Sequence, residues 1–141
     1  MKVTVDTNVL ISATFWYGDS NKIIELAEQK KIGLILSKEI IEEYKNVLDY
    51  EEIQERIKNK NLEMKQSVQK IISISKIIAP TRKINIVYDD PDDNKVLECA
   101  VSGNVDCIIT KDKHLLKIKE FQGIKIVTPE EFLESFFEIG L

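Results

Sequence analysis

Short apolar runs alternate along the chain with segments whose apolar residues recur at helical spacing. Strands written as continuous apolar runs are typical of parallel sheets that helices cover on both faces. We therefore expect an α/β fold, an open parallel sheet of about five strands with helices on both faces. The expected strands are 3–5, 33–36, 76–79, 105–110 and 124–127.

The segments between these strands carry further signals. Residues 50–75 are helical in pattern and strongly charged, and a break near 59–61 predicts a helical hairpin that projects from the sheet. The aromatic residues 15–17 favour either a loop packed on the core or a surface on which bases stack. Ser20 is expected to cap the helix that follows. The length of 141 residues predicts one domain, over 1–141.

Two expected strands run into an acidic residue just before a helix begins. Asp6 ends the first strand, and Asp112 follows the fourth. Right-handed crossovers place the start of every such helix at the carboxyl edge of the sheet, where open α/β sheets bind ligands. Aspartate is also a good helix N-cap, so Asp6 taken alone is as consistent with a cap as with a ligand.

Helical periodicity singles out one glutamate among the three in 38–48. At about 100° per residue, Glu43 lies about 100° from the centre of the apolar stripe, Glu39 about 140° and Glu42 about 160°. Glu43 therefore borders the buried face, whereas the other two are expected to point to water.

The acidic cluster at 89–93 stands before another expected helix. Acids in a first turn and a proline near a helix start are favoured for structural reasons alone. Asp93 differs from its neighbours because it precedes Leu97 and Ala100 by four and seven residues, which places it in line with the buried stripe. Asp90 and Asp92 remain alternatives for this position, as Glu42 does for Glu43.

The four acids Asp6, Glu43, Asp93 and Asp112 are thus expected at one rim of the sheet. Carboxylates held this close cannot all stay ionised without cations, and an oxygen-only ligand set selects Mg²⁺ or Mn²⁺. Two such ions about 3.5–4 Å apart can activate water and stabilise the leaving oxygen of a phosphodiester. The pattern therefore predicts metal-dependent phosphodiester cleavage that needs no histidine base.

Three polar residues stand beside these acids. Asn8 and Thr110 are placed to orient carboxylates or a metal-bound water, although both could equally be cap or turn residues. His114 is the one histidine of the chain, and we expect it at a surface position on the helix after Asp112.

The composition bears on nucleic-acid partners, membrane partners and the state of the two cysteines. A net charge of −4 argues against a nucleic-acid partner only at first sight, because bound cations would cancel it. No apolar run approaches the ~18 residues that span a bilayer, and no leader pattern is visible, so we expect a cytoplasmic protein without a membrane partner. Cys99 and Cys107 are expected to be reduced and buried.

The order of these motifs resembles the PIN-domain family, in particular its branch of VapC-like toxin components of toxin–antitoxin systems. The resemblance covers nearly the whole chain. It rests on VDTNVLISA at 5–13, IIEEYKNVL at 40–48, DPDDNKVLECA at 90–100, IITKDKHLL at 108–116 and TPEEF at 128–132.

The resemblance implies a PIN-like fold and a Mg²⁺- or Mn²⁺-dependent endoribonuclease. The acidic quartet of the family falls on Asp6, Glu43, Asp93 and Asp112. A homodimer held inactive by a cognate antitoxin protein is also implied, with RNA as the substrate. Lys111 stands in a turn where many relatives carry glycine or another residue.

Other functional readings are open at this stage. A PIN nuclease could act in RNA processing rather than as a toxin, and a domain of this kind could bind RNA or a partner without catalysis. A receiver-like phosphoacceptor would need an acidic pair after the first strand, but Asp6 stands alone there. A phosphatase would need a second aspartate where the chain has Asn8.

Overall fold

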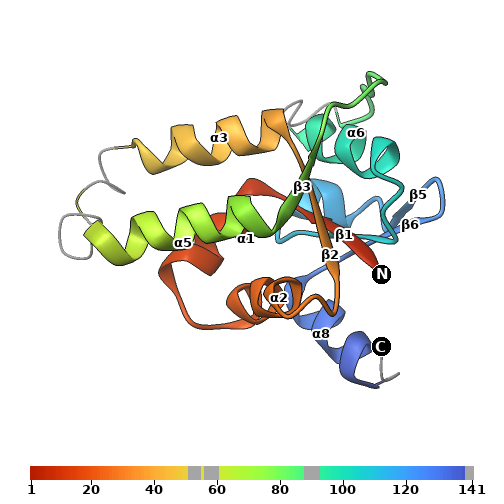
Figure 1. The fold of residues 1–141 in the computed structure, drawn as a ribbon. Coiled ribbons are helices and arrows are strands. Elements are labelled where there is room, and N and C mark those ends of the chain that lie inside the picture. The colour runs from red at the N-terminus through yellow and green to blue at the C-terminus, as the bar shows by residue number, and fades with distance from the viewer. Residues whose placement is uncertain (51–54, 56–60, 88–92, 139–141) are drawn as a thin grey trace.

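The computed structural model describes residues 1–50, 55, 61–87 and 93–138. Six strands form one sheet in the order β3-β2-β1-β4-β6-β5, and all neighbours are parallel except β5 and β6 (Figure 1). The strands are β1 (Lys2–Val5), β2 (Gly33–Ser37), β3 (Ser75–Ile78), β4 (Cys107–Ile109), β5 (Glu120–Phe121) and β6 (Ile124–Val127).

Helices connect and cover these strands. Figure 1 shows α3 and α6 on one side of the strands, with α2 and α8 together on the other. The helices are α1 (Thr7–Phe15), α2 (Asp19–Glu28), α3 (Lys38–Leu48), α5 (Asn61–Ile74), α6 (Asn94–Ser102), α7 (Lys113–Leu116) and α8 (Pro129–Glu138). Residues 3–5 of β1 are all fully buried, as expected for a central strand covered on both faces.

The sequence predictions of the fold are confirmed with one addition. All five expected strands are present, within one or two residues of the expected ends. The sheet has one strand more than the five expected, β5, which pairs antiparallel to β6 at the edge of the sheet. The two strands are joined by Gln122 and Gly123, both with positive φ, as in a tight type I′ hairpin. A two-residue strand is too short to carry an apolar pattern, so only the Gln-Gly turn signals it.

The predicted helical hairpin is only partly within the described residues. Helix α5 lies where the second arm was expected, whereas the first arm after residue 50 and the break near 59–61 lie mostly outside the part of the chain that the structure describes.

The first two helices are capped by Asp6 and Gly18. Asp6 is the N-cap of α1, which was one of its two predicted roles, so Asn8 does not cap this helix. Helix α2 begins one residue before Ser20, with Gly18 as its N-cap, so Ser20 does not cap it either. At α8, Thr128 and Glu131 exchange the two hydrogen bonds of a capping box.

The apolar interior agrees with the sequence pattern. Cys99 and Cys107 are free and buried, as predicted. Within the described ranges, no helix has both the length and the apolar character needed to cross a bilayer.

Candidate metal centre

Asp6 lies at the carboxyl end of the central strand and has two structural partners. Its Oδ1 accepts a hydrogen bond from the Val9 amide at 3.0 Å, which is the N-cap bond of α1. Its Oδ2 accepts from the Thr110 hydroxyl at the end of the neighbouring strand β4. The predicted choice between cap and ligand is therefore not exclusive, because a carboxylate has lone pairs beyond these two bonds.

Burial makes the charge of Asp6 expensive. The side chain is 4% exposed, and desolvation raises the pKa of its carboxyl above the usual 3.8. The hydrogen bonds from Thr110 and Val9 lower this pKa, whereas the nearby charges of Asp112 and Glu43 raise it further. A buried acid that is surrounded by other acids is most stable beside a cation.

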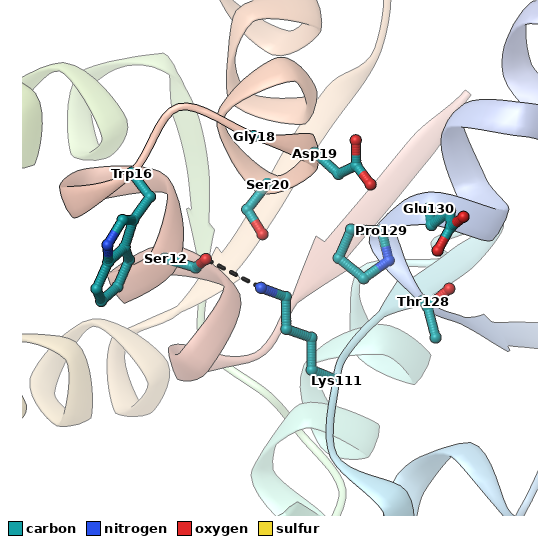
Figure 2. A pocket seen from close by; sticks show the side chains of 9 residues that line it. All are labelled: Ser12, Trp16, Gly18, Asp19, Ser20, Lys111, Thr128, Pro129 and Glu130. Atoms are coloured by element: carbon teal, nitrogen blue, oxygen red, sulfur yellow. Dashed lines mark hydrogen bonds between the residues drawn. The ribbon is translucent and has the colours of Figure 1, made fainter.

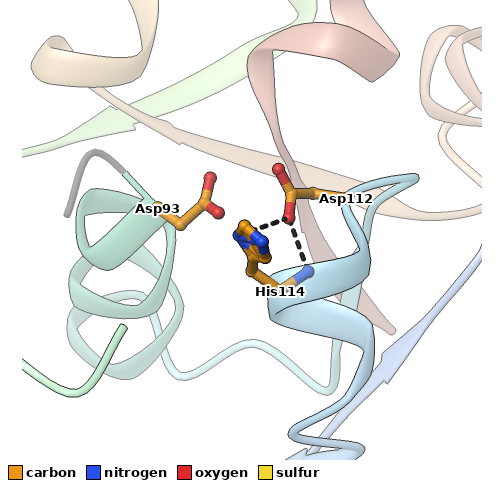
Figure 3. A group of neighbouring side chains, drawn as sticks. All are labelled: Asp93, Asp112 and His114. Atoms are coloured by element: carbon orange, nitrogen blue, oxygen red, sulfur yellow. Dashed lines mark hydrogen bonds and ion pairs between the residues drawn. The ribbon is translucent and has the colours of Figure 1, made fainter. Parts of the chain in front are cut away.

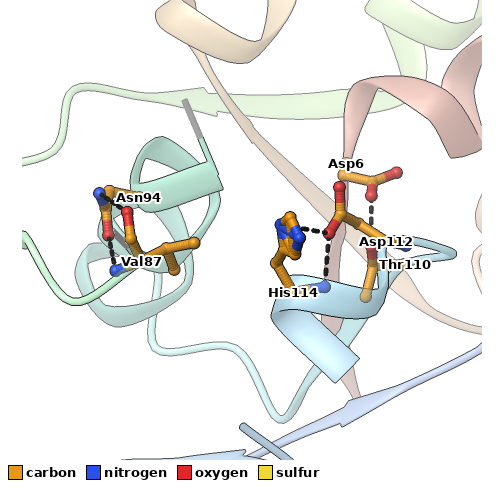
Figure 4. A network of polar contacts seen from close by, with 6 residues as sticks. All are labelled: Asp6, Val87, Asn94, Thr110, Asp112 and His114. Atoms are coloured by element: carbon orange, nitrogen blue, oxygen red, sulfur yellow. Dashed lines mark hydrogen bonds and ion pairs between the residues drawn. The ribbon is translucent and has the colours of Figure 1, made fainter. Parts of the chain in front are cut away.

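Thr110 links Asp6 to Asp112. Its hydroxyl donates to Asp6 and also accepts a hydrogen bond from the Asp112 amide at 2.9 Å. Asp112 is in turn the N-cap of α7, accepting from the His114 amide at 2.7 Å (Figure 4). One buried hydroxyl thus connects the ends of β1 and β4.

A small cavity brings together three of the four predicted acids. It has a volume of about 20 Å³ and is lined by Asp6, Thr7, Asn8, Glu43, Asp93 and Val96. We call it the acidic cavity. A volume of this size holds one water or one ion. Asn8, one of these lining residues, is exposed.

Glu43 is the glutamate of α3 that faces this cavity. Its side chain is 34% exposed and pairs with Lys95 of α6, whereas that of Glu42 is 59% exposed and pairs with Lys38. Glu39 is exposed as well. The predicted separation of these glutamates by helical rotation is confirmed in their burial.

Lys95 was missed by the sequence reasoning. It brings a positive charge onto Glu43 at the border of the acidic cavity. The sequence signal for this residue is its position two residues after Asp93, in the first turn of the same helix.

Asp93 is the N-cap residue of α6 and faces Asp112 and His114 from across the sheet edge (Figure 3). One ligand atom from each of these three side chains lies within 4.8 Å of the others. Asp89, Asp90 and Asp92 belong to the residues that the structure does not describe.

His114 corrects a prediction. It was expected at the surface, but its side chain is only 27% exposed, and its Nδ1 lies 4.0 Å from Asp112 Oδ1. Nδ1 is buried and has no hydrogen-bond partner among the described residues. His114 donates the amide that Asp112 accepts as the N-cap of the four-residue helix α7, so the two residues are held side by side. The position of His114 two residues after an N-cap aspartate was the sequence signal for this contact.

Asn94 fixes the start of α6. Its side chain accepts from the Ile86 and Val87 amides at 3.1 and 2.9 Å and donates to the Val87 carbonyl at 3.2 Å (Figure 4). Since Asn94 is buried and adjacent to Asp93, this clamp sets the position of the Asp93 backbone.

The donor set fits a divalent cation. Carboxylates of Asp6, Glu43 and Asp93 line one cavity, and Asp93, Asp112 and His114 form a second group that shares Asp93 with the first. Carboxylate oxygens suit Mg²⁺ and Mn²⁺, and an imidazole nitrogen is accepted more readily by transition metals than by Mg²⁺.

Solved structures share this fold. The protein PAE2754 from Pyrobaculum aerophilum superposes with a TM-score of 0.61 at 15% identity, covering 98% of this chain and 99% of that one. A chain of VapBC2 from Rickettsia felis, solved bound to a DNA fragment from their promoter, gives 0.60 at 16% identity, covering 89% and 97%. No curated protein sequence matches this chain.

A family model supplies the stronger comparison. The model of the PIN domain matches residues 2–114, which include Asp6, Glu43, Asp93 and Asp112. PIN domains are generally nucleases. The sequence match, together with the sheet and the acids at its carboxyl edge, shows that this chain belongs to the PIN domain family.

Proposed function

We propose that this protein is a Mg²⁺- or Mn²⁺-dependent endoribonuclease whose metal centre is built from Asp6, Glu43, Asp93 and Asp112. The observation that carries the proposal is the convergence of three of these acids on the acidic cavity, with the fourth linked to Asp6 through Thr110. Bound divalent ions would supply an activated water and neutralise the scissile phosphate.

The side chains have separable roles in this proposal. Asp93 belongs to both donor groups, so its carboxylate would help to hold a divalent ion bound at either of them. Asp6 is held rigidly by the Val9 amide and the Thr110 hydroxyl, which leaves its remaining lone pairs for the metal. Lys95 restrains Glu43, and the exposed Asn8 amide is placed to orient the RNA or a bound water.

The test is a matched pair of substitutions on one helix. Glu43→Gln should lower Mn²⁺-dependent cleavage of a single-stranded RNA by about 100-fold, because it removes a charged ligand. Glu42→Gln changes the same side chain one residue away, at a solvated position, and should retain activity within about twofold. Asp6→Asn should abolish cleavage while the far-ultraviolet circular dichroism stays that of a folded chain.

Two outcomes would oppose the proposal. Equal activity of the Glu43→Gln and Glu42→Gln variants would remove α3 from the centre. Metal binding by the unmodified protein without turnover of any RNA would favour the alternative of a non-catalytic RNA- or partner-binding domain.

We also propose that the protein is the toxin of a toxin–antitoxin pair, dimeric and acting on RNA in the cytoplasm. The motif order and the likeness to a chain of VapBC2 support a cognate antitoxin. Co-expression with the product of the neighbouring reading frame tests this, since an antitoxin should co-purify and suppress cleavage. A nuclease that keeps full activity in that co-expression would instead favour a role in RNA processing.

A further inference from the structure

A second cavity lies beside the metal centre. It has a volume of about 320 Å³, within the range of sites for small ligands, and we call it the rim cavity. It is shared by the start of α2, the middle of α1, the turn after β4 and the start of α8 (Figure 2). Lys111 of its lining stands between Thr110 and Asp112, so the two sites share one turn of the chain.

The rim cavity offers hydrogen-bond donors that suit an anion. Lys111 Nζ donates to Ser12 Oγ at 3.0 Å, which uses one of its three donors. The first turn of α2 has no side-chain cap, so its amides and the positive end of the helix dipole are available to an anion. Within the described ranges no carboxylate forms an ion pair with Lys111.

Ser20 is an independent sign of a missing ligand. Its side chain is 3% exposed, yet its Oγ has no hydrogen-bond partner among the described residues. A buried hydroxyl left without a partner destabilises the folded protein. In Figure 2 this hydroxyl is turned into the cavity, toward the side from which Lys111 enters. A ligand oxygen placed between them would satisfy it.

Trp16 adds an aromatic surface next to these donors. It lines the rim cavity, packs against Phe15 with ring centroids 5.8 Å apart, and is still 51% exposed. The carboxylates of Asp19 and Glu130 also line the cavity, but Figure 2 places them on the side opposite Trp16. The donors of Lys111 and Ser20 therefore lie between the ring on one side and these two carboxylates on the other.

We propose that the rim cavity binds one nucleotide of the RNA beside the cleaved bond, which rests on the nuclease function proposed above. Its phosphate would be held by Lys111, Ser12 and Ser20, and its base would stack on Trp16. A phosphate and an aromatic face side by side are the two features that single-stranded RNA presents at every nucleotide.

The single tryptophan of the chain makes the proposal testable without cleavage. In metal-free buffer, a short single-stranded oligoribonucleotide should quench Trp16 fluorescence and reach saturation. An abasic oligomer of the same length should bind more weakly and leave the fluorescence nearly unchanged. Inorganic phosphate should compete with both at high concentration.

Matched variants separate this cavity from general charge effects. Lys111→Met should weaken RNA binding about 5- to 10-fold. It should also make the slope of log K against the logarithm of the salt concentration shallower by about 0.7, which is the contribution of one phosphate contact to a single strand. Lys113→Met removes the same charge at an exposed position outside the cavity and should stay within twofold. Ser20→Ala should weaken binding about threefold without lowering the midpoint of thermal unfolding.

The outcomes also separate this proposal from the nuclease proposal. Equal losses for Lys111→Met and Lys113→Met would overturn it, as would phosphate binding with no effect of RNA on Trp16, or quenching by an acidic peptide but not by RNA. If the rim cavity alone is wrong, metal-dependent cleavage by the unmodified protein persists. If only the nuclease assignment is wrong, the quenching and its loss in Lys111→Met persist.

Discussion

Asp6 combines a structural role with the metal-binding role that we propose for it in one carboxylate. An Asn side chain at this position would keep both contacts, because its oxygen would accept the capping bond from the Val9 amide and its NH2 group would donate to the Thr110 hydroxyl. The charge is therefore not required by the fold. It is retained at a buried position where burial and two neighbouring acids oppose it, and such conflicts are typical of functional sites.

This conflict predicts a pH-dependent gain from Asp6→Asn in metal-free buffer. Because the folded-state pKa of Asp6 is raised above 3.8, the native state binds its proton more tightly than the unfolded chain. The contribution of Asp6 to the free energy of unfolding of the wild type is then greatest below pH 3.8, and it falls as the pH rises through the raised pKa. The variant should be more stable by about 1–3 kcal/mol at pH 7 and no more stable at pH 3.

Urea unfolding of both proteins across this pH range is the measurement. A variant less stable than wild type at pH 7 would mean that the carboxylate stabilises the fold without metal, contrary to the burial argument. Other acids titrate in both proteins, so the difference between the two curves isolates Asp6.

His114 leads to a prediction about metal choice. An imidazole beside Asp93 and Asp112 adds a nitrogen donor that a transition metal accepts more readily than Mg²⁺ does. His114→Gln should therefore weaken Mn²⁺ binding about 10-fold and Mg²⁺ binding much less, as measured by calorimetry. Equal affinities of wild type and variant for both ions would show that His114 contacts no metal.

At the scale of elements, α6 is positioned by a close contact at its carboxyl end. A Cβ on Gly103 would lie 2.8 Å from Ile35 Cγ2 and 3.0 Å from the Cys99 carbonyl oxygen, so α6 reaches β2 closely only because residue 103 has no side chain. Asp93 stands at the opposite end of this helix. A displacement of the helix would therefore be transmitted to the metal centre.

Gly103→Ala should consequently lower both stability and activity. Overpacking of this kind destabilises by about 1–3 kcal/mol, and thermal unfolding should show it. Gly18→Ala is the matched control for stability, because a Cβ there meets nothing within 4 Å. If Gly103→Ala unfolds at the wild-type temperature, the helix has room that the structure does not show.

Elements with a clear apolar pattern were predictable, whereas elements without one were missed or gave no sign of which side faces inward. Continuous apolar runs predicted the strands β1, β2, β4 and β6. The apolar stripe of α3 predicted a helix and placed Glu43 at the border of its buried face. Strand β5 and helix α7 are too short for a pattern, so the antiparallel edge and the inward side of His114 were missed. The pairing of Lys95 with Glu43 depends on how two helices meet, which no single segment encodes.

At the scale of the whole molecule, the charge balance connects the two proposed sites. The chain has a net charge of −4, and two bound divalent ions would bring it to zero. Without metal, the acids at the carboxyl edge repel the phosphate groups that the rim cavity is proposed to hold. Metal binding should therefore strengthen RNA binding as well as permit cleavage.

The same balance predicts that metal reverses the stability order of wild type and Asp6→Asn. An ion that binds only the folded chain stabilises it by about 2.7 kcal/mol at 100 times its dissociation constant, roughly 10 °C in the unfolding midpoint of a domain this size. The variant loses a ligand and should gain far less. Wild type should thus unfold below the variant in a chelator and above it in saturating Mn²⁺, when both are followed by circular dichroism. Parallel shifts of the two proteins would mean that the ion binds away from Asp6, and the metal centre would then have to be sought elsewhere on the sheet edge.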